Sequence, residues 1–199
     1  MASQGPLFPA TAASLANAGT SENANAWTSP GNVGADDGAE ASITAATYDS
    51  PDISELLVAS NFGFTIPSGS TIDGVTVEIE RRDQAIGAAS DNRVQLSTST
   101  AFAGLVGTNK ADTPLDWPTA ATVKTYGGAA DTWSSGLTVT QINDPGFAVF
   151  LSVQADAANT DIFVDFIRVT VTYTEPVSVY LPVLVMAAPI PAGWRAFRR

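Results

Sequence analysis

Within residues 72–80, hydrophobic and polar residues alternate strictly from Val75 to Glu80. The apolar side chains fall on every second position, at Val75, Val77 and Ile79, and threonine or glutamate stands between them. A period of two residues is typical of a β-strand with one face in the core and the other in water. The pattern therefore predicts a half-buried strand in this segment.

A second long segment, residues 162–173, is also apolar at every second position, but the parity changes partway along it. Ile162, Val164 and Phe166 share one parity, and the apolar residues that follow share the other, namely Ile167, Val169, Val171 and Tyr173. One extra residue in one strand of a pair produces such a shift. We therefore expect a β-bulge, or a strand that exchanges faces, at Phe166–Ile167.

Shorter apolar runs, separated by turns rich in Gly, Pro, Asn and Asp, complete the pattern. They predict strands at residues 56–59, 62–66, 93–97, 122–126 and 147–154. We expect helix only as a short turn at residues 52–56. Together these elements predict an all-β, antiparallel β-sandwich of jelly-roll type. Its predicted core positions are Val75, Val77, Ile79, Val94, Leu96, Val149, Leu151, Ile167, Val169 and Val171.

The two ends of the chain lack this pattern. Residues 1–26 are rich in Ala, Ser, Asn and Gly, which predicts an extended N-terminal arm. Residues 176–199 combine apolar side chains with four prolines, which exclude a long helix or a central strand. We therefore expect a β-sandwich domain at residues 27–175, followed by a proline-punctuated, apolar and basic C-terminal arm.

Charge is distributed unevenly along the chain. The 199 residues include 20 acidic and 9 basic side chains and no histidine, for a net charge of −11. Residues 1–80 contain ten acidic and no basic residues, whereas residues 176–199 contain three arginines and no acidic residue. Net negative charge repels phosphate groups, so we expect neither nucleic-acid binding nor attraction to an anionic membrane. The basic end predicts an acidic partner surface, on its own subunit or on another.

The composition also excludes most common catalytic mechanisms. Without cysteine or histidine the chain lacks thiol nucleophiles, imidazole bases and the usual zinc and copper ligands. Glu78 and Glu80 come nearest to a catalytic carboxylate pair, but both fall on the predicted solvent face beside Arg81 and Arg82. Nothing there gives the two carboxyl groups the different environments that an acid and a base require. We expect no enzymatic activity and no cofactor.

Two further groups leave alternatives open. Asp36 and Asp37 precede Gly38 in a loop rich in oxygen ligands, which suits a calcium ion or an Asx turn. Four aromatic residues suit either a sugar-stacking platform or a buried core, namely Trp27, Trp117, Tyr126 and Trp133. We favour the turn and the core. The loop lacks the ligand spacing of an EF-hand, and a tryptophan beside a turn more often closes the end of a core.

Several segments resemble β-sandwich domains in structural proteins of tailed bacteriophages. They are residues 61–81 (NFGFTIPSGSTIDGVTVEIER), 126–133 (YGGAADTW), 142–147 (INDPGF) and 164–173 (VDFIRVTVTY). In such domains a glycine follows the tryptophan, where this chain has Ser134. The resemblance implies a non-enzymatic virion protein, made in the host cytoplasm, whose partners are the major capsid protein or other virion subunits.

Within that resemblance, a stiff body with extended ends favours a capsid decoration, or cement, protein. The alternatives are a tail-fibre, head-fibre or adhesin-type β-sandwich module, with or without a glycan-binding surface, and a generic β-sandwich interaction module. We expect a homo-oligomer, with a trimer favoured. The predicted interface is the C-terminal arm, through Tyr180, Leu181, Val183, Trp194, Arg195, Phe197, Arg198 and Arg199. The competing interpretation is that the arm folds back over an edge strand of its own sandwich.

Overall fold

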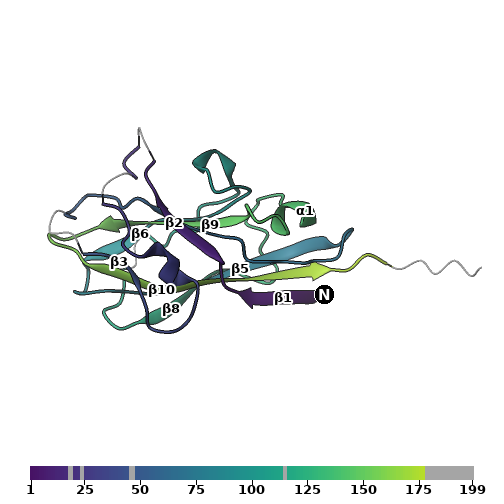
Figure 1. The fold of residues 1–199 in the computed structure, drawn as a ribbon, viewed down its shortest axis with the longest axis horizontal. Coiled ribbons are helices and arrows are strands. Elements are labelled where there is room, and N and C mark those ends of the chain that lie inside the picture. The colour runs from purple at the N-terminus through teal and green to yellow at the C-terminus, as the bar shows by residue number, and fades with distance from the viewer. Residues whose placement is uncertain (18–19, 23–24, 45–47, 114–115, 178–199) are drawn as a thin grey trace, which may run out of the picture.

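The computed structural model describes residues 1–17, 20–22, 25–44, 48–113 and 116–177. Over these residues the chain forms two antiparallel sheets that lie face to face (Figure 1). Helix is confined to three short turns, η1 (Pro30–Val33), η2 (Phe102–Gly104) and α1 (Val139–Ile142). The predicted all-β sandwich is confirmed.

The first sheet, called sheet A, contains the two longest strands. Its order is β1 (Ala2–Leu7), β10 (Ile162–Thr174), β5 (Thr71–Asp83) and β8 (Thr122–Gly127), and β3 (Ala41–Ile43) pairs with the beginning of β10. The second sheet, sheet B, has the order β2 (Thr11–Leu15), β4 (Leu56–Ser60), β9 (Ala148–Ala155), β6 (Ala89–Ser97) and β7 (Leu105–Val106). From β4 to β10 the chain changes sheet at every connection except the one between β6 and β7. This alternation is the jelly-roll arrangement.

The core lies between the two sheets, where the alternation predicts it. All ten predicted core positions have an exposed fraction of 0% and belong to one apolar cluster. Full burial of a Val, Leu or Ile side chain stabilises the folded state by roughly 1.5–3 kcal/mol. A smaller apolar cluster covers the outer face of sheet B, through Leu56, Val58, Ala148 and Phe150.

The predicted bulge in β10 is confirmed, one residue earlier than expected. The ladder between β5 and β10 shifts register between Val164 and Phe166, which leaves Asp165 as the extra residue. Beyond the shift, Ile167 enters the core cluster. Phe166 packs edge-on against Phe8, with 5.9 Å between the ring centroids. The bulge therefore separates two registers of one strand.

Two predicted elements are wrong. Residues 62–66 are not a strand: Asn61 and Gly63 adopt positive φ angles of 59° and 75°, and the backbone amide and carbonyl of Ile66 bond instead to the Asn143 side chain. Residues 52–56 form no helical turn, because Ile53 bridges to Gln154 and Leu56 begins β4. The alternation at 62–66 still reports burial, but the hydrogen bonds that define a strand depend on distant residues.

The predicted N-terminal arm is also wrong. Residues 2–7 form β1 on β10, and residues 11–15 form β2 on β4, so this segment supplies one edge strand to each sheet. Its small polar residues carry little signal because an edge strand is held largely by main-chain hydrogen bonds. Leu7 and Ala12 pack against the core cluster and anchor the two strands.

Among the described residues, no helix is long and apolar enough to cross a membrane.

Candidate functional site

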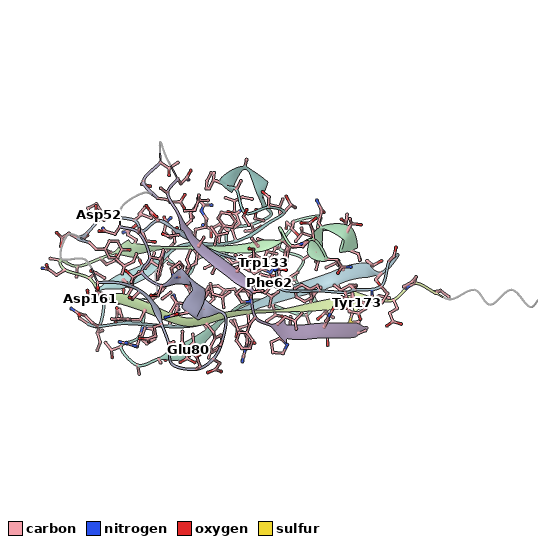
Figure 2. All side chains as sticks on the ribbon, in the orientation of Figure 1. Asp52, Phe62, Glu80, Trp133, Asp161 and Tyr173 are labelled. Atoms are coloured by element: carbon pink, nitrogen blue, oxygen red, sulfur yellow. The ribbon has the colours of Figure 1, made fainter. Side chains whose placement is uncertain are left out.

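The predicted interface residues lie outside the described part of the chain. They are Tyr180, Leu181, Val183, Trp194, Arg195, Phe197, Arg198 and Arg199. The structure does describe the point from which their segment departs. Tyr173, still buried, lies at the end of the sandwich opposite Asp52 and Asp161 (Figure 2).

The chain leaves the sandwich directly after β10. All residues from Thr174 to Val177 are exposed, and Val177 is 89% exposed. In Figure 1 this stretch leads away from both sheets. Pro176 passes close to Gly69, such that a Cβ atom on Gly69 would lie 3.6 Å from the Pro176 Cβ. The C-terminal segment therefore starts beside the loop that precedes β5.

A groove of about 590 Å³ opens at the same end of the molecule. Residues 68–72 form one wall, and residues 132, 135–140 and 143 form the other. Seven of the thirteen lining residues carry hydroxyl groups, none is charged, and the apolar members are Ile72, Leu137 and Val139. Such a surface suits an uncharged, partly apolar chain rather than an anion or a metal ion.

Local hydrogen bonds hold the two walls of this groove in place. Thr138 and Gln141 form a capping box that starts α1. Asn143, directly after α1, receives a hydrogen bond from the Ile66 amide and donates one to the Ile66 carbonyl, each at 2.9 Å. A single side chain thus joins the α1 wall to the loop before β5. The groove is preformed, so a ligand would not have to order its walls.

Charge pairing leaves the described body with carboxylates in excess. Each of its six basic side chains forms an ion pair, and seven acidic residues take part in these pairs. The other thirteen of the 20 acidic residues have no ion pair in the described structure. Asp73, Asp144 and Glu175 are among them, and each lies next to a lining residue of the groove or on the departing chain. The described body therefore presents an acidic surface on which every lysine and arginine is already paired.

One group of acidic residues could hold a hard cation. Carboxylate oxygens of Asp36, Glu80 and Asp165 lie within 4.8 Å of one another on the outer face of sheet A. Burial raises the pKa of Glu80 and the pKa of Asp165. Repulsion from Asp165 and from Asp36 raises the pKa of Glu80 further, and repulsion from Asp36 does the same for Asp165. Two neighbours already compensate this charge: the Gly38 amide donates to Asp165 at 3.0 Å, and Arg168 lies 3.9 Å from Asp36.

Asp37, next to Asp36, forms the Asx turn that the sequence favours. The Asp37 side chain accepts a hydrogen bond at 2.9 Å from the amide of Ala39, two residues later.

Glu78 and Glu80 are the candidate catalytic pair of the sequence. Glu78 is paired with Arg168, whose Nε lies 3.0 Å from the Glu78 Oε2. Both glutamates do lie on the outer face of sheet A, as predicted, because their neighbours Val77 and Ile79 enter the core.

The four candidate platform aromatics are core residues. Trp27, Trp117, Tyr126 and Trp133 have exposed fractions between 0% and 4%. Each polar atom finds one partner: Trp27 donates to the Glu55 carbonyl, Trp133 to the Val75 carbonyl, and both Trp117 and Tyr126 donate to Asp91. None of these rings offers a face to a sugar. The prediction that they close the core is confirmed.

The placement of Arg81 on the solvent face is wrong. Arg81 is 4% exposed and lies between the sheets, paired with Asp91 and within 5.0 Å of the Trp117 ring centroid. The period of two residues contained this information, because Arg81 continues the inward series of Val75, Val77 and Ile79. Sequence reasoning missed it because a charged residue is rarely fully buried unless it is paired. The partner, Asp91, belongs to the other sheet.

Comparisons with known proteins add little. No protein-family model matches the sequence, and no curated protein matches it. Among solved structures, one described as "CBM4 structure and function" is similar over 65% of this chain and 80% of its own, with 11% sequence identity and a TM-score of 0.35. A likeness this weak says nothing about function.

Proposed function

We propose that this chain is a non-catalytic structural subunit of a bacteriophage virion, of the capsid decoration type. The sandwich is the body, and residues 176–199 attach it to a neighbouring subunit. The resemblance of residues 61–81 and 126–133 to phage structural proteins is the reason for proposing a virion. The charges and the chain path of the described residues support separate roles for the body and for its C-terminal segment.

The distribution of charge carries the proposal. Every lysine and arginine side chain of the body is already paired with a carboxylate, and thirteen carboxylates have no ion pair within the described residues. The three arginines of residues 176–199 come after the last acidic residue, Glu175. An acidic body followed by an apolar and basic segment favours contact between unlike surfaces of neighbouring subunits.

The path of the chain supports an outward reach over a fold-back. Residues 174–177 are exposed and lead away from the sheets (Figure 1). A segment that covered an edge strand would need main-chain donors at regular intervals, and the four prolines remove donors from it. The apolar side chains of the segment need a protein surface, which a neighbouring subunit provides.

The glycan-binding alternative finds less support. The four aromatic residues that could form a stacking platform are buried. The groove beside α1 has no aromatic side chain in its lining. A sugar site usually needs an exposed ring, so attachment to protein is the better proposal.

Deletion of residues 176–199 tests the proposal. The truncated protein should keep its melting temperature to within a few degrees but fail to enter particles assembled with the other virion proteins. A full-length chain carrying Ala187→Ser, a mild change inside the segment, serves as the control and should be incorporated normally. If the truncated protein is incorporated normally, or unfolds while its folded fraction is still incorporated, the segment does not attach the subunit.

The number of copies per particle separates the capsid from other locations. Quantitative mass spectrometry of purified particles should find hundreds of copies, as a decoration protein on a capsid lattice requires. Tens of copies or fewer would place the chain in a tail or portal complex instead.

A further inference from the structure

The groove beside α1 and the described start of the C-terminal segment, residues 174–177, lie at the same end of the molecule. Gly69 lines the groove, and Pro176 passes beside it. We propose that this groove, formed by residues 68–72 and 132–143, receives residues 178–199 of a second copy of the chain. This inference rests on the proposed attachment role of the segment and adds the surface to which it attaches.

The path of the chain favours a second copy over the chain's own segment. After β10 the described residues lead away from the sandwich, and Val177 is almost fully exposed. To enter its own groove, the chain would have to turn back toward the body after Val177. Twenty-two residues remain beyond Val177. At roughly 3.3 Å per extended residue they span up to about 70 Å, enough to reach a neighbouring body.

The groove matches the uncharged part of the segment. Ile72, Leu137 and Val139 provide an apolar floor for residues such as Trp194 and Phe197. The surrounding hydroxyl groups can bond to the backbone of an extended chain, whose main-chain groups have no partners of their own.

The rim of the groove matches the charged part of the segment. Asp73 follows the lining residue Ile72, and Asp144 follows Asn143. Neither carboxylate has an ion pair with a described lysine or arginine. Arg195, Arg198 and Arg199 would therefore meet carboxylates that are not neutralised by the body's own cations.

The arrangement is head to tail, because one copy gives its segment and the next gives its groove. Such a contact closes into a ring when the rotation between copies permits, and continues as an open chain when it does not. The trimer favoured from the sequence is one closed form of this contact. In a closed ring, the groove of every copy holds a segment, and the segment of every copy lies in a groove.

Two full-length variants allow a direct test. Thr140→Arg places a large cation on the exposed face of α1 inside the groove, where the Thr140 side chain makes no hydrogen bond to another described residue. Trp194→Ala with Phe197→Ala removes the anchors from the segment. The control is Thr119→Arg, the same change at an exposed threonine in the loop before β8, outside the groove.

Sedimentation equilibrium measures the outcome. The wild-type chain and Thr119→Arg should associate, and each of the two test variants should associate about tenfold or more weakly. A mixture of the two should form a 1:1 complex, because one supplies an intact segment and the other an intact groove. Ser68→Trp, a second exposed lining position, should act as Thr140→Arg does if that variant is poorly folded.

Other results overturn the inference. A monomeric wild-type chain, unchanged association of both groove variants, or no complex in the mixture would each show that the groove does not hold a second copy's segment. Binding of a neutral oligosaccharide to the groove, blocked by Thr140→Arg, would identify a different occupant. These results are distinct from failure of the proposed function, since a segment that docks only on another virion protein leaves the chain monomeric while its deletion still prevents incorporation.

Discussion

Arg81 of β5 and Asp91 of β6 form an ion pair across the interior of the sandwich, with side-chain exposures of 4% and 0%. Asp91 also accepts hydrogen bonds from the Trp117 indole and the Tyr126 hydroxyl, both at 2.8 Å. The amide of Asp112 donates to it as well. One carboxylate therefore joins both sheets and the loop before β8.

Removal of this carboxylate should be the most damaging polar substitution in the protein. Asp91→Ala leaves the Arg81 guanidinium buried without its counter-charge and two aromatic donors without a partner. A loss of about 3–5 kcal/mol in the free energy of unfolding is expected, measured by urea denaturation. The surface pair of Lys124 and Asp112 provides the comparison, and Asp112→Ala should cost about 1 kcal/mol or less. Equal losses for the two substitutions would contradict a special role for Asp91.

Asp83 should make the protein less stable as the pH rises. Burial raises the pKa of its carboxyl group, the nearby Asp116 adds to this, and the amides of Ala88 and Ala89 oppose it. Neither carboxylate oxygen forms a hydrogen bond of normal geometry within the described residues. Because the folded-state pKa lies above the unfolded value of about 3.9, protonated Asp83 adds to the free energy of unfolding at low pH. This contribution is lost as the pH rises through the folded-state pKa.

Asp83→Asn tests this sign. Urea midpoints measured from pH 4 to pH 7 should fall less steeply with rising pH in Asp83→Asn than in the wild-type chain, because asparagine does not ionise. Asp161→Asn, at a half-exposed aspartate, is the matched control. Parallel curves for wild type and Asp83→Asn would mean that Asp83 does not titrate differently in the folded state.

Ser134 should be replaceable by glycine with a gain in stability. Ser134 has a φ of 51°, a left-handed conformation that costs a residue with a Cβ roughly 1–2 kcal/mol. Part of that gain is offset because glycine also frees the unfolded chain, so a net increase of about 0.5–1 kcal/mol is expected for Ser134→Gly. Ser135→Gly is the control and should lower the melting temperature, since the Ser135 hydroxyl donates to the Thr132 carbonyl at 2.7 Å. No gain from Ser134→Gly would argue against strain at this turn.

Truncation of a core side chain should leave a cavity and lower the free energy of unfolding. Leu96 is fully buried between the sheets, and Leu96→Ala should lower the free energy of unfolding by about 2–4 kcal/mol. Val123→Ala, at a residue that is 41% exposed on β8, should change it by less than about 0.5 kcal/mol. A similar small effect at both positions would place Leu96 outside the packed core.

The faces of the long strands could be predicted from the sequence because burial there alternates residue by residue. Val75, Val77 and Ile79 point inward for the same local reason that Glu78 and Glu80 point outward. The bulge near Phe166 was visible for that reason too, as a change of parity within one segment. Local geometry sets both features, so no knowledge of distant residues was needed.

Features that depend on a distant partner were decided only by the tertiary structure. Residues 2–7 became a strand because β10 offered an open edge, and residues 62–66 failed to become one because Asn143 took their hydrogen bonds. Arg81 could enter the core because Asp91, on the other sheet, neutralises it. The groove and the carboxylates of Asp36, Glu80 and Asp165 likewise join segments far apart in the chain. A period of two residues tells which side a residue faces, but only the packing of one sheet on the other determines what it meets there.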